Sequence, residues 1–84
     1  MLYLPAFEMP KLKTIPWRKF EKFLLFVGCV HDRTRGDHKI YIRSGLRRPI
    51  VLTMEGNVPI HILKNNLREL KVGNQEFLDI LKKS

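Results

Sequence analysis

The sequence has one cysteine, few acidic residues and no long apolar run, and each shortage excludes a class of protein. Cys29 stands alone, so no intrachain disulfide and no thiolate zinc site is expected, which fits a reducing cytoplasm. No apolar segment approaches the roughly 18 residues that a membrane span needs. The first residues also lack the basic start and long apolar stretch of a signal peptide. We therefore expect a cytoplasmic protein that does not use a membrane.

Acidic residues are scarce relative to basic ones. Lysine and arginine number 16 against 8 aspartate and glutamate residues, so the 84-residue chain carries a formal net charge of +8. This charge on a small body attracts polyanions, and nucleic acid is the first candidate because phosphate contacts dominate such affinities. An acidic protein and an anionic membrane surface are the competing partners. A hydrophobic content of 44% is too high for a disordered basic tail.

Hydrophobic spacing predicts helices at both ends of the chain. Residues 16–27 carry an apolar stripe at helical spacing, and Pro16 suits the first helical position. This helix is expected to be buried on two sides, with a partner-binding face as the other interpretation. A second helix is predicted from Pro59 to about residue 70, with an apolar stripe that starts at Ile60. A short third helix is predicted from Asn74 to about residue 82.

Three antiparallel strands are predicted between these helices, over residues 30–35, 39–43 and 48–54. Gly36-Asp37 is a tight-turn signal between the first two strands. The fold class is therefore α+β, with helices covering one face of a three-stranded antiparallel sheet. The same α-β-β-β-α order, here with a short C-terminal helix, occurs in double-stranded-RNA-binding domains. We expect an N-terminal arm over residues 1–13 and a single domain over residues 14–84.

Alternation along the strands predicts which side chains share a face. Ile40 and Ile42 are expected on the apolar face, with three polar-side residues opposite them: Lys39, Tyr41 and Arg43. In the first strand, His31, Arg33 and Arg35 are expected to share one face, so one sheet face should be apolar and the other basic. The candidate RNA-binding residues are Arg33, Arg35, Lys39, Tyr41, Arg43, Arg47 and Arg48, with Tyr41 as the base-stacking candidate.

No cofactor motif or hydrolase triad is visible, and the three histidines do not have metal-ligand spacing, so no cofactor or metal is expected. Proton transfer on bound RNA is the chemistry that remains possible, because RNA supplies its own nucleophile, the 2′-hydroxyl. Histidine can act as general acid or base near neutral pH. His38, at the start of a strand beside Arg35 and Lys39, is the best-placed candidate. Alternation groups it with Ile40, but the end of the strand is at the rim of the sheet.

At this point the sequence resembles the HicA-type toxins. The resemblance rests on residues 14–20 (TIPWRKF), on the turn over residues 35–41 (RGDHKIY), and on three later segments: residues 56–59 (GNVP), 62–67 (ILKNNL) and 76–78 (EFL). It implies a double-stranded-RNA-binding-like fold and cleavage of mRNA. It also implies an essential histidine at the position of His38 and neutralisation by an acidic HicB-type antitoxin.

Two features depart from the family pattern. Asp37 replaces a small serine before the histidine, and its carboxylate is expected either to act on the His38 ring, for example by orienting it, or to repel phosphate, and to alter the pH dependence of activity. Residues 9–11 are similar to the start of family members, so residues 1–8 are interpreted as an extension or as the result of an early start-codon assignment. The leading hypothesis is therefore a metal-independent endoribonuclease toxin. The alternatives are a non-catalytic RNA-binding module of the same fold and a structural role in a larger basic assembly.

Overall fold

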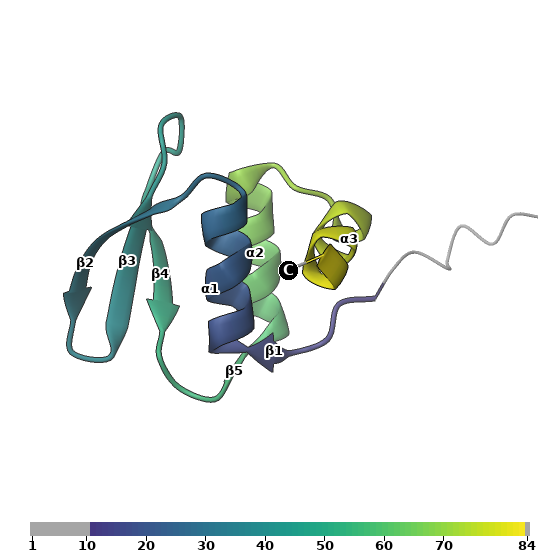
Figure 1. The fold of residues 1–84 in the computed structure, drawn as a ribbon, viewed down its shortest axis with the longest axis horizontal. Coiled ribbons are helices and arrows are strands. Elements are labelled where there is room, and N and C mark those ends of the chain that lie inside the picture. The colour runs from purple at the N-terminus through teal and green to yellow at the C-terminus, as the bar shows by residue number, and fades with distance from the viewer. Residues whose placement is uncertain (1–10, 84) are drawn as a thin grey trace, which may run out of the picture.

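The computed structural model describes residues 11–83, which form an α+β fold (Figure 1). The described helices are α1 (Trp17–Phe26), α2 (Ile60–Leu70) and α3 (Asn74–Lys83). The described strands are β1 (Ile15–Pro16), β2 (Val30–Arg35), β3 (His38–Ile42), β4 (Ile50–Thr53) and β5 (Asn57–Val58). The predicted α-β-β-β-α order with a third helix is confirmed. The prediction of an extension at residues 1–8 lies outside the described residues.

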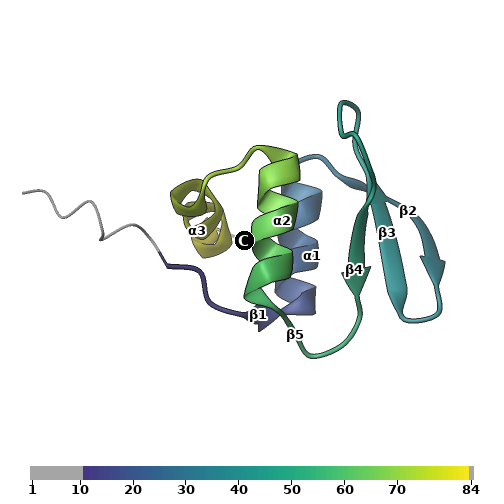
Figure 2. The ribbon, with the colours of Figure 1, turned by 180° about the vertical axis from the view of Figure 1, so that it is seen from behind.

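The main sheet has the strand order β2-β3-β4, and both pairings are antiparallel. A second ladder that the sequence did not predict joins β1 to β5, with Ile15 opposite Val58. Helices α1 and α2 lie between the sheet and α3 in both views (Figures 1 and 2). No described helix covers the far face of the sheet, which we call the open face.

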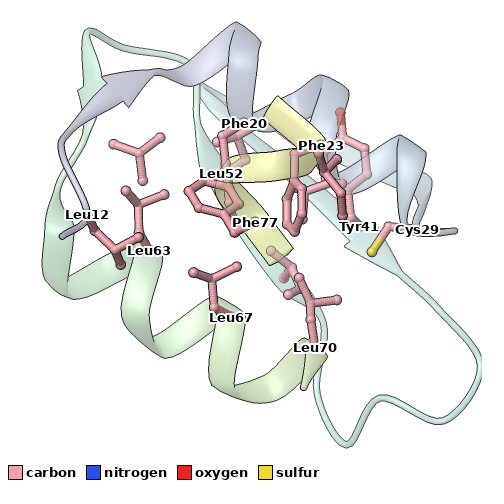
Figure 3. Close-up of a cluster of buried hydrophobic side chains, with 14 residues drawn as sticks. Leu12, Phe20, Phe23, Cys29, Tyr41, Leu52, Leu63, Leu67, Leu70 and Phe77 are labelled. Atoms are coloured by element: carbon pink, nitrogen blue, oxygen red, sulfur yellow. The ribbon is translucent and has the colours of Figure 1, made fainter. Parts of the chain in front are cut away.

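The core fills the space between the sheet and the helices (Figure 3). Its centre is aromatic: the Phe23 and Phe77 ring centroids are 4.7 Å apart and the Phe20 and Phe23 centroids are 5.6 Å apart. Such pairs contribute roughly 0.5–1.5 kcal/mol beyond the area they bury. Leu12 is buried in the same cluster, so the chain contacts the core before β1 begins.

The face prediction for β3 is wrong. Tyr41 is 1% exposed and lies in the core, while Ile42 is 40% exposed. The Tyr41 hydroxyl donates to Glu21 on α1, and the Lys39 ammonium donates to the same carboxylate over 2.5 Å. These contacts satisfy the polar ends of two side chains whose carbon atoms pack on the helices. The residues predicted to face solvent therefore face α1. Ile42 lies exposed on the open face, and Ile40 shares that face by alternation but is itself buried, at 7% exposure.

The face prediction for β2 also needs correction. His31 pairs with Tyr41, but Arg33 pairs with Ile40, so the register shifts at Asp32. This β-bulge breaks the alternation, because its extra residue changes the face on which later side chains lie. His31 therefore lies on the helix side, while Arg33 and Arg35 lie on the open face.

Two helical stripes are narrower than predicted. Helix α1 buries Phe20, Phe23 and Leu24, but Leu25 and Phe26 are 52% and 59% exposed, so it is buried on one side only. Helix α2 begins after Pro59 and buries leucines at three positions, whereas Ile60 is 38% exposed. Ile60 is the first residue of α2, shortly after β5, and this end of the helix does not yet lie over the core.

The Glu21 contacts predict a pH-dependent stability. Burial raises the pKa of the Glu21 carboxyl, but the hydrogen bonds from Lys39 and Tyr41 outweigh burial, so the pKa lies below its usual 4.5. A lowered pKa stabilises the fold above the unfolded-state value, and this stabilisation is lost as the pH falls through the folded-state value. Glu21→Gln should therefore lower the free energy of unfolding by about 1 kcal/mol at pH 7.

The difference between wild type and Glu21→Gln should shrink as the pH falls below about 4.5. Urea unfolding at several pH values measures it. Glu55→Gln, on an exposed loop, is the control and should show little change at any pH. If the difference in free energy of unfolding between wild type and Glu21→Gln stayed constant across the pH range, the assigned ion pair would be contradicted.

Candidate active site

A tight turn sets the position of His38. Arg35 and His38 form the closing pair of the β2–β3 hairpin, with Gly36 and Asp37 between them. Gly36 has φ +59°, and Asp37 is not in the positive-φ region, which is the pattern of a type II′ turn with glycine at its first central position. The Asp37 carbonyl accepts a 2.7 Å hydrogen bond from the Met54 amide. The turn is thereby tied to the end of β4.

The His38 ring is accessible and oriented. Its side chain is 48% exposed, and its Nδ1 lies 2.8 Å from Asp37 Oδ1. A carboxylate at this distance favours a proton on Nδ1, which leaves Nε2 to exchange a proton with another molecule. The predicted orienting role of Asp37 has this geometry as its support.

A cavity of about 550 Å³ opens beside His38, between β4 and the start of α2. This volume is within the usual range for small-ligand pockets, roughly 300–1,000 Å³. Its described lining is mostly uncharged: His38, Val51, Leu52, Thr53, Glu55, Gly56, Asn57, Val58, Pro59 and Ile62. The surroundings of His38 can therefore hold a flat, partly apolar group.

Two predicted RNA-binding arginines lie near His38 on the open face. Arg35 is directly opposite His38, and Arg33 forms an ion pair with Asp32. Both are exposed. Apolar side chains accompany them, since Val30 and Val51 are 55% and 46% exposed. The open face is thus a mixture of basic and apolar groups, and the prediction of one apolar and one basic face is wrong.

Three other predicted RNA-binding residues are engaged inside the fold. Tyr41 is covered by the core, so its ring is not available for stacking on a base. Lys39 is paired with Glu21. The Arg43 guanidinium donates to the carbonyls of Val27 and Leu70 over 2.9 and 3.5 Å, where the helices α1 and α2 end. Cations at these positions satisfy free carbonyls and favour the helix dipole.

Arg47 and Arg48 lie at the other end of β3 from His38, in the loop between β3 and β4 that projects at the top of Figure 1. They line a second cavity of about 480 Å³ with residues of α2. Sequence reasoning assigned both residues to RNA binding but had no signal for this cavity, because it forms only where the loop meets α2.

The remaining reactive groups are less suited to chemistry. The His31 ring contacts Tyr41 edge-on, with Nε2 2.8 Å from Thr34 Oγ1, and His61 is exposed on α2. Cys29 is buried, and burial raises the pKa of its thiol, which disfavours the nucleophilic thiolate. Within residues 11–83, no group of three or more histidine, cysteine or acidic side chains is arranged to hold a metal ion. No helix in this range is long and apolar enough to cross a membrane.

The sequence model of the family described as HicA toxin of bacterial toxin-antitoxin matches residues 17–72, more than half of the chain. The chain belongs to the HicA toxin family. The matched part of this HicA protein runs from α1 through α2 and contains the His38 turn, both cavities and the basic loop. No curated protein matches the chain. Membership makes this chain a toxin of a toxin–antitoxin system, with an antitoxin as its partner.

Asp37 is predicted to set the tautomer of His38. In wild type, the neutral ring should carry its proton on Nδ1, because that atom faces the Asp37 carboxylate. Asp37→Ser should shift the ring toward a mixture of tautomers, measured by the ¹⁵N chemical shifts of both ring nitrogens. His61, exposed on α2, is the internal control. Unchanged His38 shifts would show that the 2.8 Å contact does not orient the ring.

Proposed function

We propose that this HicA toxin is a metal-independent endoribonuclease that cuts mRNA, with His38 as its catalytic residue. The single observation that carries the proposal is the exposed His38 ring, held by Asp37 at the mouth of a cavity of about 550 Å³. A nucleotide base fits the mostly uncharged cavity. A base placed there brings its ribose and phosphate to the rim, where the histidine is.

The reaction needs only proton transfer and charge stabilisation. His38 Nε2 takes the proton of the ribose 2′-hydroxyl, and the 2′-oxygen attacks the adjacent phosphorus. The bond from phosphorus to the 5′-oxygen breaks, that oxygen takes a proton from solvent water, and His38 returns its proton to solvent. The products are a 2′,3′-cyclic phosphate and a 5′-hydroxyl, with no change in oxidation state.

The phosphorane formed during attack carries extra negative charge, and positive groups near it lower the barrier. Arg35, opposite His38 on the open face, is the nearest of the predicted arginines along the ladder. Arg33 lies on the same face, two positions before it. Both guanidinium groups are exposed and therefore accessible to a phosphate.

His38→Ala should abolish cleavage while RNA binding remains. The expected loss is roughly 100- to 10,000-fold, the contribution of general acid–base catalysis. A gel assay on a defined mRNA, with chelator present throughout, measures cleavage, and a growth assay measures toxicity. His61→Ala is the matched control and should retain both.

Other results of the same assay would contradict the proposal. Cleavage by His38→Ala at the wild-type rate would remove the histidine from the mechanism. Loss of wild-type cleavage in chelator would contradict metal independence. A wild-type protein that binds mRNA and leaves it intact would be an RNA-binding module.

The antitoxin is proposed to be an acidic HicB-type protein that acts in the cytoplasm. The formal net charge of +8 and the exposed Arg33 and Arg35 beside His38 favour an acidic partner surface. Such a surface covers the histidine without having to enter the cavity. Opposite charges accelerate encounter, and salt screens them.

The association rate with the acidic antitoxin should therefore fall steeply as salt rises, while the dissociation rate changes less. Stopped-flow mixing at several salt concentrations measures both rates. Arg33→Glu with Arg35→Glu should slow association further than Lys19→Glu with Lys22→Glu on α1. Equal effects of the two pairs would contradict an interface centred on the open face.

A further inference from the structure

The two cavities share a boundary. Val51 of β4 and Ile62 of α2 line the cavity beside His38 and also the cavity beside Arg47 and Arg48. The two spaces therefore adjoin along β4 and α2, and we call them together the β4–α2 groove, with His38 at one end and the β3–β4 loop at the other. Figure 2 shows α2 in front, running from β5 toward the end of the molecule from which this loop projects.

The charges are separated along this groove. At the His38 end, the described lining contains no lysine or arginine, and Glu55 is its one carboxylate. At the other end, three arginines meet, Arg47, Arg48 and Arg68, with Glu69 as the carboxylate among them. A smaller cavity of about 280 Å³ extends this end and adds Lys71. The lining of the His38 cavity thus contains no cation, and the arginines near His38, Arg33 and Arg35, lie on the open face outside that lining.

The arginine end also has donors that the fold leaves available. Arg47 is 84% exposed and its contact with Glu69 is long, at 3.4 Å. Exposed guanidinium groups of this kind bind phosphate oxygens.

We infer that the RNA strand leaves the His38 cavity along the β4–α2 groove and that Arg47, Arg48 and Arg68 bind phosphates of one flank. This inference rests on the proposed nuclease function and adds the path of the substrate. Two parts of this inference follow from the shared groove. One is that Arg68 takes part in phosphate binding, and the other is that the strand runs from His38 toward the β3–β4 loop. The expected substrate is a single-stranded RNA that extends beyond the cleaved bond on one defined side.

The length of the groove determines how many nucleotides the strand needs beyond the cleaved bond in order to reach the arginines. From Ile50 to Thr53, β4 extends about 10 Å at roughly 3.3 Å per residue. From Ile62 to Arg68, α2 extends about 9 Å at 1.5 Å per residue. At the roughly 3.4 Å per nucleotide of a stacked strand, about three nucleotides separate the two ends. Shorter flanks should not reach the arginines.

The experiment uses DNA strands that contain a single ribonucleotide, because only that residue has the 2′-hydroxyl needed for cleavage. One series lengthens the 5′ flank and another lengthens the 3′ flank. For wild type, kcat/KM should rise about tenfold or more when one flank, and only one, reaches about three nucleotides. Arg47→Ala/Arg48→Ala/Arg68→Ala should lose this gain, so that its kcat/KM no longer depends on the length of either flank.

Salt dependence gives an independent readout. Each phosphate contact on a single strand contributes about 0.7 to the slope of log affinity against log salt. For a long-flank strand bound to protein carrying His38→Ala, the arginine variant should lower this slope by about 2. The matched control, Lys19→Ala/Lys22→Ala/Lys82→Ala, removes three exposed charges that line neither cavity and should leave the slope unchanged.

Glu69→Gln provides a second variant if the arginine variant does not fold. It removes the carboxylate at the arginine end and frees Arg47, so KM for long-flank substrates should fall several-fold and KM for the shortest should not change. Glu76→Gln on α3 is the control. If Glu69→Gln changed KM equally for short and long substrates, the proposed path of the RNA strand would be overturned.

The outcomes separate the path from the nuclease function. If wild type cuts no strand, the proposed function fails. If it cuts the strands but neither flank matters, or the arginine variant keeps the flank effect, the path alone is overturned. Loss of antitoxin binding by the arginine variant, with the flank effect unchanged, would assign this end of the groove to the protein partner and also overturn the path.

Discussion

The inward orientation of Tyr41 is the constraint on which the arrangement of the site depends. Side chains alternate along a strand, so one buried residue determines the faces of all the others in β3. With Tyr41 in the core and its hydroxyl on Glu21, His38 must point to the opposite face. A shift of one residue would direct the His38 ring toward the helices. The contact between Glu21 and Tyr41 therefore keeps the candidate catalytic group accessible.

The same constraint separates the basic residues that stabilise the fold from those that remain available to an anion. Lys39 and Arg43 share the face of Tyr41, and both are used to hold the helices on the sheet. Arg35 shares the face of His38 and remains available to an anion. Positive charge in this toxin thus serves both the fold and the proposed RNA contact, and the net charge of +8 does not measure the size of the RNA surface.

Some of the site was predictable and some was not. The turn at Gly36-Asp37 and the position of His38 at the start of a strand follow from local rules, because a tight hairpin needs particular residues. The β-bulge at Asp32 was not predictable, since an unpaired residue leaves no local pattern in the sequence. It separates His31 from Arg33 and Arg35. The groove was equally hidden, because Arg48 and Arg68 are twenty residues apart in the chain.

By itself, the sequence determined the order of the three helices and of the three strands of the main sheet, the excess of positive charge and the residues of the His38 turn. These depend on local spacing, composition and turn chemistry, which act over a few residues. Only the tertiary structure decided which sheet face is covered, that Tyr41 is buried, and that the His38 cavity shares Val51 and Ile62 with the cavity lined by Arg68. Both alternating faces of β3 contain isoleucine or tyrosine. Packing against α1 and α2, with Glu21 as the partner of the buried Tyr41 hydroxyl, selects between them.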